Sequence, residues 1–250
     1  MKFKTLLFDI ETAPNVCFVW QGMHEVNVIE IIEEGYMLSF AWKWLGEKQT
    51  KVLAVNDFKG SLEARKKKLV LALHELFDET DVLVGHNVKG FDAKNANKYF
   101  VLYNLLPPSP YKVVDTLTIA RSNFKFNSNR LNDLGKFLKL GVKVETGGFK
   151  LWKECMEGSK KAFNKMKRYN KQDVDLLEKV YLRIRPYTKT HPNIAILNGY
   201  RCPMCDSKNV QSRGYRTLSG GFLRRRYRCN DCGRWSASQE KIRVKKDYLK

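Results

Sequence analysis

Short hydrophobic runs alternate along this chain with longer segments in which hydrophobic residues recur at helical spacing. The first run, KTLLFDI, ends on acidic residues, and further runs follow before residue 116. Apolar runs of about four to eight residues bounded by turn residues are typical of buried strands. We therefore expect strands at Lys4–Ile10, Met37–Leu45, Thr50–Asn56, Asp81–Gly85 and Lys112–Asp115.

Hydrophobic residues at helical spacing occupy most of the segments between and after these strands. Ser61 is the expected N-cap of a helix that runs to about Thr80, because its hydroxyl can accept a backbone N–H. A longer helix, from about Ser159 to Ile184, places Tyr169 and Asp173 on its hydrophobic stripe. Further helices are expected at about Phe91–Leu105, from Asp115 through Arg121, and at Leu131–Leu140 behind an N-cap at Ser128 or Asn129.

The order of these elements indicates the fold class. Strands come first, and strands alternating with helices follow, which predicts an α/β fold with a mixed sheet flanked by helices. Residues 13–36 have no clear period, so we expect a loop with a short helix, serving as a specificity loop or as a partner contact. Pro186 and Pro192 interrupt the helical pattern. We expect a main domain over residues 1–185, a linker over 186–198 and a small basic domain over 199–250.

Positive charge is concentrated toward the C-terminus. The 250 residues have a net charge of +20, from 46 Lys+Arg against 26 Asp+Glu. Residues 198–250 hold 14 Lys+Arg and 4 Asp+Glu, so about a fifth of the chain carries half of the excess. Such an excess indicates a polyanionic partner, most commonly nucleic acid, although a basic surface without a special role is the alternative.

Neither the N-terminal segment nor the length of the apolar stretches indicates a membrane protein. The N-terminal segment has no signal-peptide core, because Asp9 and Glu11 interrupt its apolar run. No apolar stretch reaches the roughly 18 residues that a membrane span requires. We expect no membrane partner and a cytoplasmic protein, or one that works in a host's cytoplasm.

Two acidic residues lie at the end of the first expected strand. Asp9 and Glu11 are two residues apart, so their side chains point to the same face of a strand. Like charges in that position repel each other, and a divalent cation between them would account for the arrangement. The alternative is a solvated strand end with incidental acids.

Two more acids are ambiguous when each is taken alone. Asp92 follows the turn GHNVKGF at the start of an expected helix, where it could simply stabilise the helix dipole. Tyr169 and Asp173 are four residues apart on one face of the long helix. A carboxylate on a hydrophobic stripe is costly unless it is paired or binds metal, or unless it lies at the edge of the stripe.

The order and spacing of these pieces are specific in combination: FDIET, then GHN-x3-FD, then Y-x3-D. Together they resemble the three motifs of the DnaQ-like, ribonuclease H-like 3′→5′ exonucleases, over about residues 3–185. Tyr169, four residues before the last acid, is similar to the tyrosine (DEDDy) branch, which includes proofreading domains of family B DNA polymerases. Asp115 in VVDTL matches a family segment whose acid is not usually a metal ligand, so we leave it out of the site.

The resemblance implies a two-metal site with Mg²⁺ or Mn²⁺. Asp9 would bridge both ions, Glu11 and Asp173 would complete the shell of one, and Asp92 would act on the other, partly through water. One ion would lower the pKa of the attacking water, and the other would stabilise charge on the leaving 3′ oxygen. Tyr169 would orient the water, since an ordinary pKa of about 10 makes tyrosine a poor base.

The same resemblance assigns roles beside the acids. Asn87 and the backbone of Thr12 would hold the terminal nucleotide. His86 would be structural, because Tyr169 already fills the role of positioning the water.

Four cysteines in the tail form a C-x2-C…C-x2-C pattern, at Cys202, Cys205, Cys229 and Cys232. Four thiolates in two turns suit one tetrahedral zinc ion, and unrelated or redox thiols are the alternative. Gly233 after the second pair fits a tight turn, and LSGGF between the pairs is typical of a hairpin loop. So small a domain has little core, so zinc should be needed for its fold.

The tail resembles the zinc ribbons of transposases and other DNA-binding proteins. Arginines that could track phosphates alternate there with aromatic residues that could stack on bases or simply fill the small core. The candidate substrate-binding residues of this segment are Arg224, Arg225, Arg226 and Arg228.

Three functions compete. The first is a stand-alone exonuclease on DNA, which could proofread only in trans with a polymerase or replication partner. The second keeps the chemistry and changes the substrate to RNA, since discrimination by the 2′-hydroxyl depends on pocket contacts. The third is a protein that binds nucleic acid on a nuclease fold, although the intact set of acids argues against it.

Overall fold

The computed structural model describes residues 3–20, 27–142, 147–195 and 201–243. The chain divides into two compact units, one spanning Lys4–Tyr181 and the other starting at Leu182. Each unit is described by itself. None of the helices in the described ranges is long and apolar enough to cross a membrane.

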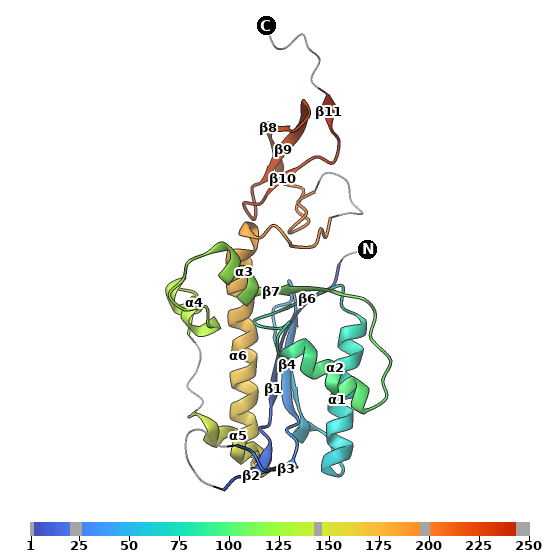
Figure 1. Ribbon diagram of the computed structural model, residues 1–250, viewed down its shortest axis with the longest axis vertical. Helices are drawn as coiled ribbons and strands as arrows, with labels where there is room; N and C mark the ends of the chain where they lie inside the picture. Colours follow the sequence, from blue (N-terminus) through green and yellow to red (C-terminus); the bar gives the residue numbers. More distant parts are fainter. Residues whose placement is uncertain (1–2, 21–26, 143–146, 196–200, 244–250) are drawn as a thin grey trace. The chain divides into compact units, whose positions relative to one another are not determined.

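A five-stranded mixed sheet forms the centre of the first unit, in the order β5-β4-β1-β6-β7 (Figure 1). The central strand β1 pairs antiparallel with β4 on one side and parallel with β6 on the other. The strands are β1 (Thr5–Thr12), β4 (Met37–Trp44), β5 (Lys51–Ala54), β6 (Val82–Gly85) and β7 (Lys112–Asp115). The expected mixed sheet is confirmed, although β5 is shorter than expected and is followed by a 3-10 helix, η1 (Val55–Asp57).

Helices cover both faces of this sheet. Residues Leu6, Phe8 and Ile10 of β1 point into a core on one face, where the ring of Phe8 lies edge-on against that of Phe77, with centroids 5.3 Å apart. This face is covered by α1 (Leu62–Asp78), which Ser61 caps as expected, and by α2 (Asp92–Leu102). The long helix α6 (Lys160–Ile184) covers the other face (Figure 1).

Polar contacts fix α6 over β1 and β4. The Ser39 hydroxyl of β4 donates to the Asn170 side chain at 3.2 Å. Farther along the helix, the ammonium of Lys43 pairs with the Glu178 carboxylate at 2.6 Å and is almost buried. A buried charge is tolerated only when it is paired. These contacts therefore set the register of α6 against the face of the sheet that carries Asp9 and Glu11.

The described residues between β7 and α6 form three short helices, and the sequence predicted only two of them. α3 (Thr116–Asn123) was expected, but α5 (Phe149–Met156) was not. α4 (Leu131–Phe137) ends earlier than expected because Lys139 adopts a φ of +56°. The expected N-cap of α4 is also wrong: Arg130 holds that position, and the hydroxyl of Ser128 bonds the Asp133 carboxylate instead.

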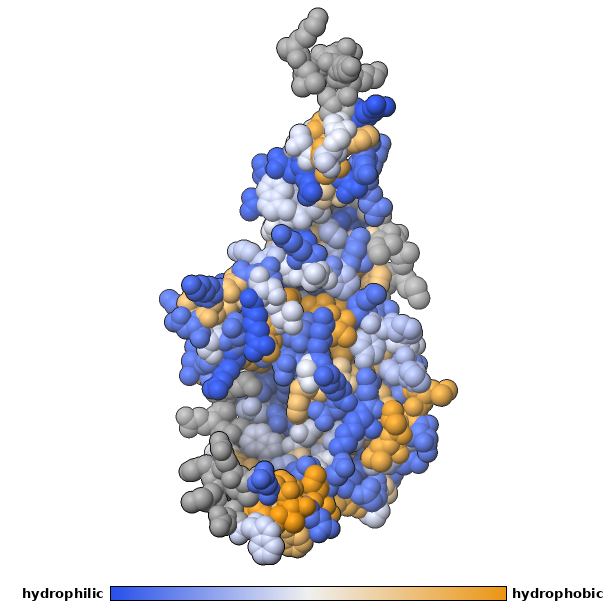
Figure 2. All heavy atoms as spheres, in the orientation of Figure 1, coloured by the Kyte–Doolittle hydropathy of each residue, from blue (hydrophilic) through white to orange (hydrophobic). Residues whose placement is uncertain are grey.

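The expected loop with a short helix at residues 13–36 is corrected by the structure. Its described part forms a β-hairpin, β2 (Val16–Phe18) and β3 (Glu30–Glu33), and residues 21–26 lie outside the described ranges. β-Branched residues favour strands, whereas the glutamates between them concealed the alternation. The hairpin is strongly exposed, including Phe18 at 58% and Trp20 at 88%, and Figure 2 shows a hydrophobic area over it.

The second unit is a small antiparallel sheet centred on β9 (Phe222–Cys229). This strand pairs with β8 (Val210–Leu218), β10 (Trp235–Ala237) and β11 (Ile242–Arg243). The expected hairpin loop is confirmed, because β8 and β9 are joined through Gly220 and Gly221, with φ values of +82° and +74°. Such backbone angles favour glycine.

Asp115 at the end of β7 connects two segments that shape the edge of the sheet. Its carboxylate caps α3 by accepting the N–H of Leu117 at 2.9 Å and that of Thr118. The same carboxylate accepts the N–H of Asn87 at 3.0 Å and that of Lys89 at 3.1 Å. Asp115 is only 4% exposed. It is therefore a structural residue that holds the turn after β6.

Replacing Asp115 with alanine should destabilise the first unit by about 2–4 kcal/mol, because several charge-assisted hydrogen bonds to backbone N–H groups are lost. Denaturant unfolding followed by circular dichroism measures the change. The matched control is Glu75→Ala on the exposed surface of α1. Equal stability of the two variants would contradict the structural role of Asp115.

Candidate active site and cysteine cluster

Three of the predicted acids converge at the end of β1. The carboxylate oxygens of Asp9, Glu11 and Asp173 lie within 4.8 Å of one another. Asp9 and Glu11 share a face of β1 because they are two residues apart, and that face lies under α6, which supplies Asp173. Asp173 is 1% exposed.

Asp92 lies beside this group without joining it. Its Oδ1 accepts the backbone N–H of Ile10, between Asp9 and Glu11, at 3.1 Å. The pairing of β6 with β1 stops at Leu7, so this part of β1 is open to the first turn of α2. Burial raises the pKa of the Asp92 carboxyl to about 7. A cation nearby would favour its ionised form.

Asn170 is a residue of the site that the sequence alone did not reveal as one. Its Nδ2 donates to the Asp9 carboxylate at 2.7 Å, and its Oδ1 accepts the Ser39 hydroxyl at 3.2 Å. The side chain is fully buried. Both ends of the amide are occupied, so Asn170 fixes the direction in which the Asp9 carboxylate points. Its position on the stripe of α6, three residues before Asp173, was the only available signal.

Tyr169 lies one helical turn before Asp173 and is partly buried. Its ring packs edge-on against Trp152, with centroids 6.1 Å apart. Trp152 belongs to α5, so the helix that the sequence did not predict supports the tyrosine. The phenol is thus carried by the same helix as Asp173 and is held by a ring contact.

The residues expected to hold the terminal nucleotide lie on either side of the acids. Thr12 ends β1, at a register irregularity that follows Glu11. Asn87 is exposed and has a φ of +69° in the turn after β6. A Cβ at Gly90 would lie 2.6 Å from Asn87 Oδ1, so glycine at this position leaves room for the present orientation of the Asn87 side chain.

His86 has the surroundings of a structural residue. One ring nitrogen lies 2.9 Å from the Thr116 hydroxyl, and the other lies 2.9 Å from the Asn129 carbonyl oxygen. Both nitrogens are therefore occupied by hydrogen bonds that connect the turn after β6 to the segment before α4.

The acids together are suited to divalent cations. Carboxylate oxygens are the ligands that Mg²⁺ prefers, and three carboxylates this close repel one another unless a cation or protons neutralise them. Asp9, Glu11 and Asp173 would hold such an ion, with Asp92 adjacent. The donor set therefore fits a hard divalent metal.

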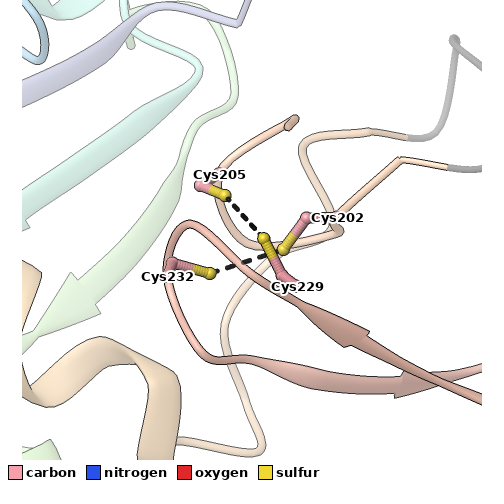
Figure 3. A group of neighbouring side chains, drawn as sticks. All are labelled: Cys202, Cys205, Cys229 and Cys232. Atoms are coloured by element: carbon pink, nitrogen blue, oxygen red, sulfur yellow. Dashed lines mark hydrogen bonds between the residues drawn. The ribbon is translucent and has the colours of Figure 1, made fainter. Parts of the chain in front are cut away.

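Four sulfur atoms of the second unit point toward a common centre (Figure 3). Cys202 Sγ lies 3.6 Å from Cys232 Sγ, and Cys205 Sγ lies 3.7 Å from Cys229 Sγ. Tetrahedral zinc with bonds of about 2.3 Å requires sulfur atoms about 3.8 Å apart, whereas a disulfide requires about 2.05 Å. The cysteine cluster thus fits one zinc ion.

Two matching turns present the cysteines. The N–H of Asp206 donates to the Cys202 carbonyl at 2.9 Å, and the N–H of Gly233 donates to the Cys229 carbonyl at 3.0 Å. Both residues have positive φ, +58° for Asp206 and +76° for Gly233. The expected turn at Gly233 is therefore confirmed, with Asp206 as its counterpart. Arg201 pairs with the Asp206 carboxylate at 3.0 Å and secures the first turn.

The four arginines expected to bind substrate all lie on β9, in the second unit. Arg225, Arg226 and Arg228 are exposed, and Arg224 is partly buried.

Changing Asn170 to alanine should lower metal-dependent activity about tenfold or more and weaken Mn²⁺ binding, because the Asp9 carboxylate loses its fixed direction. Calorimetric titration with Mn²⁺ and the dependence of the rate on metal concentration measure this effect. Gln172→Ala, at an exposed position of the same helix, is the control. Unchanged metal binding in Asn170→Ala would contradict a positioning role.

Changing Cys232 to serine should remove the zinc and unfold the second unit, because its core consists largely of the cysteines and a few neighbours. Zinc content and limited proteolysis report the loss. The first unit should keep its resistance to protease. Cys155→Ser, a cysteine of the first unit, should keep its zinc; zinc retained by Cys232→Ser would contradict the four-cysteine site.

Comparison with known proteins adds two findings. A family model described as the RNase_H superfamily matches residues 6–185. A solved family B DNA polymerase from the hyperthermophilic archaeon Pyrobaculum calidifontis resembles the structure with a TM-score of 0.51 and 15% identity. That likeness covers 74% of this chain and 25% of the polymerase, so this chain corresponds to about a quarter of it. A search of curated protein sequences found no match.

The polymerase likeness, at this identity, shows the fold alone. The family match covers well over half of the chain and includes every element that carries the converging acids. The mixed sheet with parallel and antiparallel strands flanked by helices is RNase H-like, as the sequence predicted. This chain belongs to the RNase_H superfamily, with the fold of a nuclease-type enzyme.

Proposed function

We propose that this protein is a metal-dependent 3′→5′ exonuclease that degrades DNA from single-stranded or frayed 3′ ends. The observation that carries the proposal is the convergence of Asp9, Glu11 and Asp173 within 4.8 Å. Asp92 beside them and Tyr169 one turn before Asp173 complete the set of the DEDDy branch. The RNase_H superfamily match and the polymerase likeness support a nuclease that acts on nucleic acid.

Different residues of the chain would bind the metal and orient its ligands. Asp9, Glu11 and Asp173 would hold the divalent metal, and Asn170 keeps Asp9 in its direction. The bound metal would supply activation of water and stabilisation of charge on the leaving 3′ oxygen.

Tyr169 would orient the water that attacks the terminal phosphodiester. Its ring is supported by Trp152. A phenol hydroxyl can both donate and accept a hydrogen bond without ionising. The role of Tyr169 is therefore positioning, while Asn87 and the backbone of Thr12 would hold the terminal nucleotide beside the acids.

The second unit would contribute affinity. Its sheet carries the arginines, and zinc would keep the turns of the cysteine cluster in place. A polymerase or replication partner would act in trans.

Asp9→Asn and Asp173→Asn should each lower the Mg²⁺-dependent release of mononucleotides from a 3′-labelled DNA oligonucleotide by about 100-fold or more, because each removes a charged metal ligand. Glu75→Gln, an exposed acid on α1, is the control. Release that survives in either variant would overturn the assignment of the site.

The same assay with DNA and RNA oligonucleotides of equal sequence separates the substrates. Faster release from DNA is expected, and faster release from RNA would make the protein an exoribonuclease instead. Binding of both polymers without release from either would leave a nucleic-acid-binding protein on a nuclease fold, and would overturn the proposed function.

A further inference from the structure

The arginines of β9 fall on two different faces of the small sheet. Residues along a strand alternate between faces, so Arg224, Arg226 and Arg228 lie on one face and Arg225 lies on the other. Antiparallel neighbours add Arg216 opposite Arg224 and Trp235 opposite Arg228. Directly opposed residues share a face. We call the set Arg216, Arg224, Arg226, Arg228 and Trp235 the arginine face.

The opposite face is engaged by the chain's own side chains. The Arg225 guanidinium donates to the Tyr215 hydroxyl at 3.0 Å and lies 5.5 Å from the centre of its ring. Tyr227 and Val210 line a cavity together with Ala195 of the preceding segment. Side chains of this face are therefore already in contact with other parts of the second unit.

The arginine face, by contrast, carries charge that the described residues do not neutralise. Arg216 and Arg224 are directly opposed, and like charges in that relation destabilise a sheet. Arg224 Nε is buried without a hydrogen-bond partner among the described residues. No carboxylate of residues 201–243 pairs with these four arginines, and Asp206 and Asp231 are held by other partners. A bound polyanion would remove the repulsion.

Spacing and aromaticity indicate the form of that polyanion. Alternate residues of a strand are about 6.6 Å apart, which is comparable with the separation of successive phosphates in an extended nucleic-acid strand. Trp235 is 49% exposed on the same face, and the Arg226 guanidinium lies 5.8 Å from the centre of its ring. An indole can stack only on a base whose face is accessible, and a duplex hides those faces.

We propose that the arginine face binds single-stranded nucleic acid, with Arg224, Arg226 and Arg228 contacting successive phosphates and Trp235 stacking on a base. This inference rests on the proposed function for the presence of a nucleic-acid substrate. It adds that the arginine face is the binding surface and that the bound nucleic acid is single-stranded. Arg225, on the opposite face, takes no part and serves as an internal comparison.

The test measures binding of fluorescent (dT)15 to the full chain by anisotropy over a series of salt concentrations, without added Mg²⁺. The slope of log affinity against log salt is negative, and each lost phosphate contact reduces its magnitude by about 0.7 for a single strand. Arg226→Ala/Arg228→Ala should therefore reduce the magnitude of the slope by about 1.4. Lys208→Ala/Arg225→Ala removes the same charge elsewhere in the second unit and should leave the slope unchanged.

Trp235→Ala tests the stacking. Its affinity for (dT)15 should fall about tenfold, whereas an abasic strand of the same length should bind the variant and the unaltered chain alike. A blunt duplex should bind more weakly than (dT)15 and should not respond to the Trp235 change. Zinc content must be equal in all variants, which excludes loss of the fold.

Equal slopes for the two double variants would overturn the proposal, as would a duplex that depends on Trp235 in the same way. These measurements require no hydrolysis. The binding results therefore remain valid if the nuclease assay shows no activity. If the protein is an active nuclease but changes in the arginine face do not affect binding, this inference alone is overturned.

Discussion

Repulsion among converging carboxylates is the constraint on which the architecture depends. Asp9, Glu11 and Asp173 can be this close only if the backbone holds them there and a cation or protons offset their charge. The backbone does so through β1 at the centre of the sheet and α6 across its face. Ser39 and Lys43 fasten α6 to β4, so the same contacts that stabilise the fold also bring the acids together.

Surroundings decide what each acid of this domain can do. Asp115 accepts four backbone N–H groups, which leaves its carboxylate committed to holding the turn after β6. Asp92 accepts the backbone N–H of Ile10 and remains beside the converging acids. Asn170 is uncharged, yet it bonds Asp9 directly. Asp115 therefore fixes the turn after β6, whereas Asp92 connects the start of α2 to the end of β1.

The second unit follows a different principle. Within residues 201–243 its hydrophobic core consists of Cys202, Met204 and Cys229 with a few partly buried neighbours, so a metal held by the four cysteines would take the place of packing. That arrangement leaves nearly every side chain of β8 and β9 near the surface. A sheet that needs few side chains for its own stability can present arginines and a tryptophan on its surface.

Local features of the sequence determined the mixed sheet, the pair Asp9 and Glu11 on one face, and the spacing of the four cysteines, because periodicity and short covalent separations act within a few residues. The hairpin at β2–β3 and helix α5 escaped prediction, since mixed polar and β-branched residues give no clear period. Only the tertiary structure joined Asn170 to Asp9, 161 residues apart, and Asp92 to Ile10, 82 residues apart. It also brought Tyr215 to Arg225, because the pairing of strands decides which face of β9 is packed by the chain and which is open.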